Sequence, residues 1–141
     1  KCPLATVCAA KATGQPHDIP KTRIRPKPRA VHHHAVIVRN ARTGKILLEQ
    51  RPSHGMWASM WQVPTVESET RLRREAIRKR MTVMVSSLRF LRRFEFTTTH
   101  RQISFYVYAA TSEIDRGMWR NPAKLDHLPM SSAQKRVLTP T

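Results

Sequence analysis

Thr97, Thr98, Thr99 and His100 form the run of side chains best suited to contact a ligand. A β-strand pattern follows, in which apolar and polar side chains alternate: Ile103, Ser104, Phe105, Tyr106, Val107 and Tyr108. Hydroxyl and backbone groups at the mouth of a strand can hydrogen-bond a ligand while the strand holds them in place. Threonine also favours strands, so a purely structural role for this run stays open.

Two other groups contain possible metal ligands. Strand alternation directs His32 and His34 to one face and His33 to the other, so at most two of these imidazoles converge. We therefore favour packed or solvated histidines. Cys2 and Cys8 supply half of the ligands that an iron–sulfur cluster needs, and a small disulfide is the alternative.

The charge balance points to a polyanionic partner. The 141 residues contain 26 Lys and Arg against 9 Asp and Glu, which gives a net charge of +17. Nucleic acid is the commonest partner of such a field. Anionic lipid is disfavoured because no basic helix has a strongly apolar opposite face. A solvated basic surface without a partner remains an alternative interpretation. No secretory signal or membrane-length apolar run is present, so we expect a cytoplasmic, nucleoid-associated monomer.

One domain must position these residues, preceded by a proline-rich linker over residues 14–30. The patterns predict these elements in chain order: a strand over 31–39, a hairpin turn over 40–44, a strand over 45–51, a basic amphipathic helix over 67–83, one or two strands over 84–96, and a helix over 131–138 capped by Ser131. Two tryptophans between Gly55 and Pro64 predict an ordered loop packed on the sheet.

Four stretches stand in a characteristic order. They are the Cys2 and Cys8 segment, residues 47–52 with Gly55-Met56-Trp57 and residues 61–64, Thr98-Thr99-His100, and residues 128–131. Together they resemble the C-terminal part of MutY-type adenine DNA glycosylases, which remove adenine mispaired with 8-oxoguanine. The matching family patterns are the end of a Cys-x6-Cys-x2-Cys-x5-Cys iron–sulfur loop, LLxxRP…GLWxxPxxE, Phe-Ser/Thr-His, and a terminal element.

The resemblance implies an α+β fold over residues 31–141, a Nudix-like sandwich with a mixed, curved sheet flanked by helices. It also implies a lesion-reading role in which Thr99 meets the edge of 8-oxoguanine, His100 is the motif histidine and Thr98 takes the aromatic position. Arg51, from the LLxxRP stretch, joins the expected DNA-binding residues. Thr98 departs from the family pattern because threonine cannot stack as phenylalanine does, although Phe96 lies nearby in the sequence.

A Nudix-like fold invites a rival function, the metal-dependent hydrolysis of nucleoside diphosphate-linked substrates. That chemistry needs a helix with the pattern Arg-Glu-x-x-Glu-Glu-x-Gly to hold divalent metal. Arg74-Glu75 fits its start, but Arg78 and Lys79 fall on the next acidic positions and Met81 falls on the glycine. Cations at these positions repel Mg²⁺, so the sequence argues against a hydrolase.

The resemblance also implies a division of labour. Residues 1–13 correspond to the remnant of an iron–sulfur loop, and the catalytic carboxylates of the family lie in an N-terminal domain upstream of it. We therefore expect a [4Fe–4S] cluster in the full-length parent, with Cys2 and Cys8 as two of its four ligands, and none in this fragment. The expected partners are that catalytic domain and double-stranded DNA containing 8-oxoguanine opposite adenine.

Overall fold

The computed structural model describes residues 2–14 and 27–139. The predicted linker lies largely outside these residues. The elements, in chain order, are α1 (Ala9–Ala12), β1 (Arg29–Asn40), β2 (Ile46–Gln50), β3 (Trp61–Gln62), β4 (Thr65–Ser68), α2 (Arg74–Arg80), β5 (Arg89–Thr97), β6 (Arg101–Ser112), β7 (Met118–Arg120), the short 3-10 helix η2 (Pro122–Lys124) and α3 (Ser132–Leu138).

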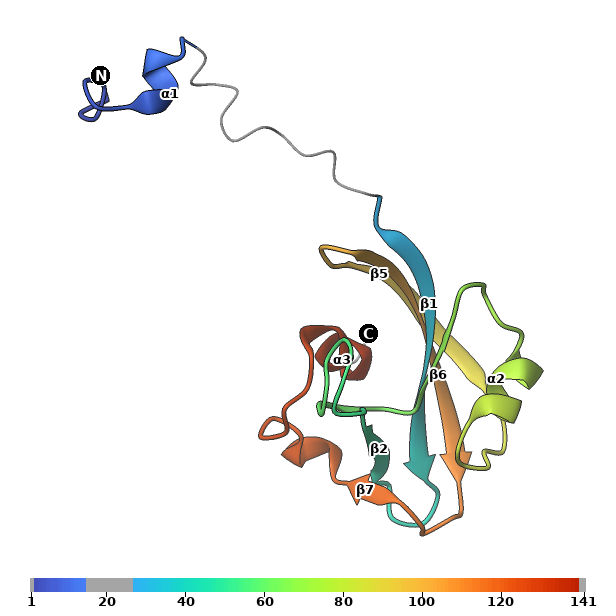
Figure 1. Ribbon diagram of the computed structural model, residues 1–141. Helices are drawn as coiled ribbons and strands as arrows, with labels where there is room; N and C mark the ends of the chain where they lie inside the picture. The colour runs from blue at the N-terminus through green and yellow to red at the C-terminus, as the bar shows by residue number, and fades with distance from the viewer. Residues whose placement is uncertain (1, 15–26, 140–141) are drawn as a thin grey trace.

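A mixed seven-stranded sheet forms the centre of the domain, with the order β3-β2-β1-β6-β5 and with β4 and β7 paired to β1 and β2. Strands β1 and β6 run parallel along their whole lengths, from Arg29 beside Arg101 to Asn40 beside Ser112. Strands β5 and β6 form an antiparallel hairpin. The fold is therefore α+β, as predicted, and the long strands bend as expected of a curved sheet (Figure 1).

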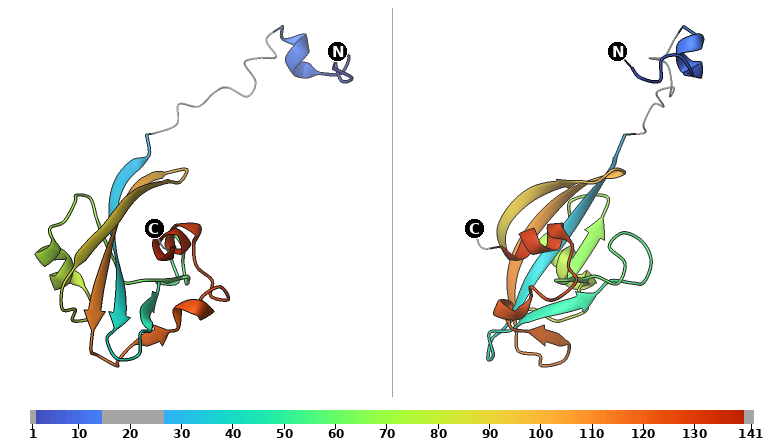
Figure 2. Two further views of the ribbon diagram at one scale, coloured as in Figure 1. Left: turned by 180° about the vertical axis from the view of Figure 1, so that it is seen from behind. Right: turned by 90° about the vertical axis from the view of Figure 1, so that its left-hand side faces the viewer.

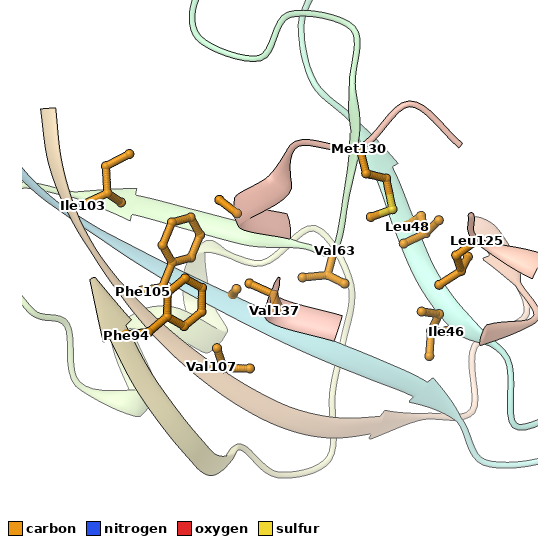
Figure 3. Packing of buried hydrophobic residues seen from close by; sticks show 12 residues of the cluster. Ile46, Leu48, Val63, Phe94, Ile103, Phe105, Val107, Leu125, Met130 and Val137 are labelled. Carbon is orange, nitrogen blue, oxygen red and sulfur yellow. The ribbon is translucent and has the colours of Figure 1, made fainter. Parts of the chain in front are cut away.

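Helices α2 and α3 cover opposite faces of the sheet (Figures 1 and 2). The alternation in β6 is confirmed, since its residues divide between two buried clusters. The cluster beneath α3 includes Ile103, Phe105, Val107, Phe94 and Val137 (Figure 3). The cluster beneath α2 includes Tyr106, Tyr108, Val36, Val38 and Ile77. Because both faces are covered, Tyr106 and Tyr108 are buried as fully as the apolar members of the alternation, whereas Ser104 is half-buried.

Side-chain bonds end several elements, and two of these ends, at Asn40 and at Ser131, lie where the sequence predicts. The Asn40 carboxamide accepts hydrogen bonds from the backbone N–H groups of Arg42 and Thr43, which closes the turn before β2. The Ser131 hydroxyl accepts from the N–H of Gln134 at 3.2 Å and caps α3, as predicted. At the other end of α3, the guanidinium of Arg92 donates to the backbone carbonyls of Arg136, Val137 and Thr139, which satisfies groups that a helix end leaves open.

The helix predicted over residues 67–83 is shorter than its pattern. Thr65–Ser68 is instead strand β4, whose Thr65, Val66 and Glu67 pair with β1. The helix begins after Arg73 and ends before Met81, so the arginines at 71 and 73 lie in the connecting segment. Pairing with a distant strand overrides the helical periodicity of this stretch.

Candidate functional site

The turn of the β5–β6 hairpin, residues 98–100, is closed by Thr98 and Arg101. The backbone N–H of Thr98 donates to the carbonyl of Arg101 at 2.8 Å. The Thr98 hydroxyl accepts from the N–H of Arg101 at 3.0 Å and donates to its carbonyl at 3.2 Å. The hydroxyl of Thr98 is thus used within the turn, where it sets the path of the next two residues.

Thr99 and His100 are the exposed residues of this turn. Across residues 2–14 and 27–139, neither the Thr99 hydroxyl, its backbone N–H nor the His100 ring has a hydrogen-bond partner. The carbonyl of His100 accepts from the N–H of Arg29 at the start of β1. The parallel β1 strand therefore supports the base of the turn, while the functional groups of its tip face solvent.

Phe96 does not reach this tip. Its ring is half-buried and packs edge-on against Trp57, with the two centroids 5.8 Å apart. Trp57 belongs to the ordered loop between β2 and β3, which packs on the sheet as predicted. Phe96 thus anchors the loop to the hairpin on the α3 side of the sheet.

Arg51 lies at the start of the same loop, and its guanidinium is hydrogen-bonded within the protein. It donates to the carbonyl of Met56 at 3.0 Å, to the side chain of Gln62 at 2.9 Å and to the carboxylate of Glu67 at 2.7 Å. Only 14% of the Arg51 side chain is exposed. These bonds hold a loop in which Trp57 and Ser59 both adopt a left-handed backbone conformation, each with φ of 57°.

Glu67 also approaches His33, with 3.7 Å between carboxylate oxygen and ring nitrogen. His33 is fully buried and packs edge-on against Phe105 and Trp57. Burial lowers the pKa of His33 to about 4, outweighing the carboxylate of Glu67, so the ring is neutral at pH 7. Burial opposes ionisation of Glu67, but His33 and Arg51 together lower the pKa of its carboxyl.

The triple histidine divides between the faces of the sheet, as the alternation predicts. His34 stacks on Tyr106 at 5.3 Å, accepts from the N–H of Leu72 through Nε2 and donates from Nδ1 to the carbonyl of Val66. Burial lowers the pKa of His34. Its two bonds fix a neutral ring, which is a packing role. Within the described ranges, no three His, Cys, Asp or Glu side chains gather into a possible metal site.

Helix α2 carries cations at the positions where a Nudix hydrolase needs carboxylates. Arg78 and Lys79 are exposed on it, and Glu75 stands in its first turn. The last turn holds only basic charges: Arg78, Lys79 and Arg80. This arrangement attracts anions rather than Mg²⁺.

Cys2 and Cys8 are free thiols, exposed and half-buried respectively, beside α1. Two thiols are half of the ligand set of a [4Fe–4S] cluster, so these residues do not fit that group by themselves. No helix in the described parts of the chain is long and apolar enough to cross a membrane.

The four residues predicted to contact DNA therefore fall into two places. Thr98, Thr99 and His100 share one turn, as expected. Arg51 lies on another element and belongs to a cluster with Glu67 and His33, which the positive charge of Arg101 also influences. Sequence reasoning missed this cluster because its members are distant in the chain. Only His33 gave a signal in the sequence, as an ionisable side chain at a position of the first predicted strand that proves to be fully buried.

The comparisons with known proteins agree on the fold. The family model of the NUDIX domain matches residues 34–140. The C-terminal domain of mouse MUTYH, solved in complex with human PCNA, is 17% identical with a TM-score of 0.61, over 76% of this chain and 83% of that chain. The MutT protein of Methanosarcina mazei Go1 is 15% identical with a TM-score of 0.62, over 80% and 92% of the two chains.

A third similar structure is the NUDIX domain of Shewanella oneidensis NrtR, solved with ADP ribose. It is 10% identical with a TM-score of 0.60, over 87% of this chain and 93% of that chain. No curated protein sequence matches the chain significantly. At these identities the likenesses establish a shared architecture and leave the function to be argued from the residues.

Proposed function

The chain belongs to the NUDIX domain family, and on that premise we propose that it is the lesion-recognition domain of a MutY-type adenine DNA glycosylase. In this proposal the domain binds DNA and reads 8-oxoguanine opposite adenine. A catalytic domain of the same protein breaks the glycosidic bond. Cys2 and Cys8 would be the last two ligands of the parent's [4Fe–4S] cluster.

One observation carries the proposal: on a turn closed by hydrogen bonds, the hairpin tip presents a hydroxyl and an amide that have no partner among the described residues, and an exposed imidazole. 8-Oxoguanine differs from guanine in its C8 carbonyl and in an N7 that has become a donor. The Thr99 hydroxyl can accept from N7–H, and the Thr99 N–H can donate to the C8 carbonyl. Guanine has no C8 carbonyl, so the Thr99 N–H finds no acceptor there, and its N7 only accepts, so the hydroxyl must donate instead. The pair of groups therefore favours the lesion.

The other residues have supporting roles. Thr98 holds the turn, and the exposed ring of His100 is available to a base edge or a phosphate. Arg51 fixes the neighbouring loop and adds positive charge close to Glu67 and His33. The net charge of +17 supplies affinity for the DNA backbone that is independent of sequence.

The alternative within the family is a metal-dependent hydrolase. The cations of α2 count against it, since Arg78 and Lys79 replace metal ligands. Incubation with Mg²⁺ and a panel of nucleoside triphosphates, including 8-oxo-dGTP, separates the two functions. We expect no release of pyrophosphate, whereas duplexes containing 8-oxoguanine should bind more tightly than matched guanine duplexes. Pyrophosphate release together with equal duplex binding would replace this proposal with the hydrolase.

A further inference from the structure

A basic groove of about 470 Å³ lies on the α2 side of the sheet, at the opposite end of β5 from the hairpin turn. It is lined by Arg71, Arg73, Arg74 and Glu75 and by the rings of Phe90 and Tyr108. Phe90 lies beside Tyr108 in the register, next to a bulge between Phe90 and Arg92. A bulge of this kind redirects the side chains of an edge strand.

The arginines of this groove are available for an anion. Neither Arg73 nor Arg74 has an ion-pair partner within residues 2–14 and 27–139. Arg71 packs its guanidinium over the ring of Tyr106, 5.1 Å from the centroid, which orients the group without neutralising it. Against these three cations the lining holds one carboxylate, that of Glu75. The groove therefore has a net positive charge.

The groove also exposes an aromatic face. Phe90 is 40% exposed, and its ring is held edge-on against Tyr108, with centroids 5.6 Å apart and planes at 69°. Tyr108 is buried, so it supports Phe90 from below. An exposed, rigidly held ring beside several guanidinium groups is the combination that binds a base and its flanking phosphates.

We propose that this groove binds a single-stranded stretch of nucleic acid, with phosphates on Arg71, Arg73 and Arg74 and one base stacked on Phe90. A closed duplex hides the faces of its bases, so the aromatic contact selects unpaired nucleotides. An acidic peptide would use the cations but would leave the ring without a planar partner. This site lies away from the hairpin tip and does not depend on 8-oxoguanine.

Anisotropy of fluorescein-labelled dT10 at low salt tests the proposal on the full chain. Phe90→Ala should weaken binding about tenfold, and Phe90→Trp should restore it. Leu91→Ala is the matched control, because Leu91 is similarly exposed at 38% but lines a groove beside Val137 and Leu138 of α3. Thermal unfolding of each variant separates loss of the site from loss of the fold.

The charge requirement is tested separately. Arg73→Glu combined with Arg74→Glu should weaken dT10 binding at least tenfold and reduce the salt slope by about 1.4, since each phosphate contact to a single strand contributes about 0.7. Arg116→Glu, in the exposed segment before β7, is the control for charge reversal outside the groove. Apart from the general loss that its change in net charge causes, it should change the affinity for dT10 less than twofold.

Equal losses in Phe90→Ala and Leu91→Ala, or displacement of dT10 by polyglutamate as readily as by unlabelled dT10, would overturn the proposal. The oligonucleotide contains no 8-oxoguanine, so failure here leaves the hairpin proposal standing.

Discussion

Thr98 and Arg101 close the β5–β6 turn through both backbone and side chain, with the Thr98 hydroxyl 3.0 Å from the Arg101 amide nitrogen. This relationship explains why a threonine stands at position 98, where the adenine glycosylases that the sequence resembles have an aromatic residue. A hydroxyl that is satisfied inside the turn serves to position Thr99 and His100. We propose that this positioning, rather than contact with a base, is the role of Thr98.

Thr98→Ala removes the two side-chain bonds of the turn and should lower the free energy of unfolding by about 1–2 kcal/mol. Thr98→Ser keeps the hydroxyl and should restore most of that loss. Chemical denaturation of the three proteins measures the difference. Because the tip as a whole loosens, Thr98→Ala should weaken binding to 8-oxoguanine and guanine duplexes alike. A selective loss for the lesion duplex alone would instead make Thr98 a contact residue.

Arg51→Met removes three hydrogen bonds and leaves Glu67 with one ionic neighbour fewer, and we expect a loss of about 2–3 kcal/mol in the free energy of unfolding. Arg51→Lys should rescue it poorly, since an ammonium cannot bond three separate acceptors in the geometry of the guanidinium fork. The control is Arg42→Met, which breaks the Arg42–Asp115 pair. Both of its side chains are 67% exposed, so the cost should stay below about 1 kcal/mol. Similar losses in the free energy of unfolding for the two methionine variants would show that Arg51 does not fix the loop.

His33 predicts a pH dependence of stability. Its pKa of about 4 in the folded protein lies below the ordinary value of about 6.5 in the unfolded chain. The unfolded chain therefore binds the proton first, and stability that is full above pH 6.5 is lost as the pH falls towards 4. For this one group the loss approaches about 3 kcal/mol.

His33→Phe should flatten this part of the profile, since phenylalanine keeps a planar ring against Phe105 and Trp57 and does not titrate. The difference between the two proteins in urea unfolding, measured from pH 7.5 to 4, gives the contribution of His33 together with its effect on the neighbouring Glu67. Parallel profiles would show that His33 titrates in the folded protein as it does in the unfolded chain.

Sequence patterns predicted those elements whose causes are local. The alternation of residues 103–108 indicates both faces of β6, and the side-chain bonds of Asn40 and Ser131 close a turn and cap a helix within four residues. The helix over residues 67–83 was predicted too long, because the pairing of Val66 with His34 joins segments 32 residues apart. Periodicity within one segment contains no information about such a partner.

The candidate site also contains one part with local causes and other parts that depend on contacts between distant segments. The turn of Thr98, Thr99 and His100 is contiguous in the chain, so its motif and its geometry coincide. The contacts among Arg51, Glu67 and His33 join three separate elements, and the groove at Phe90 depends on the packing of α2 against the β5–β6 hairpin. Both arise from tertiary packing, which a single sequence does not specify.

The ratio of dissociation constants for a guanine duplex and an otherwise identical 8-oxoguanine duplex tests the central claim most directly. For the unaltered chain we expect a ratio of about tenfold, the effect of one good polar contact to a base. Thr99→Ala removes the hydroxyl and keeps the backbone N–H, so it should lower this ratio by weakening binding to the 8-oxoguanine duplex more than binding to the guanine duplex. Thr97→Ala, an exposed threonine two residues earlier, should keep the ratio. A ratio near one for the unaltered chain, or equal losses on both duplexes in Thr99→Ala, would contradict the account.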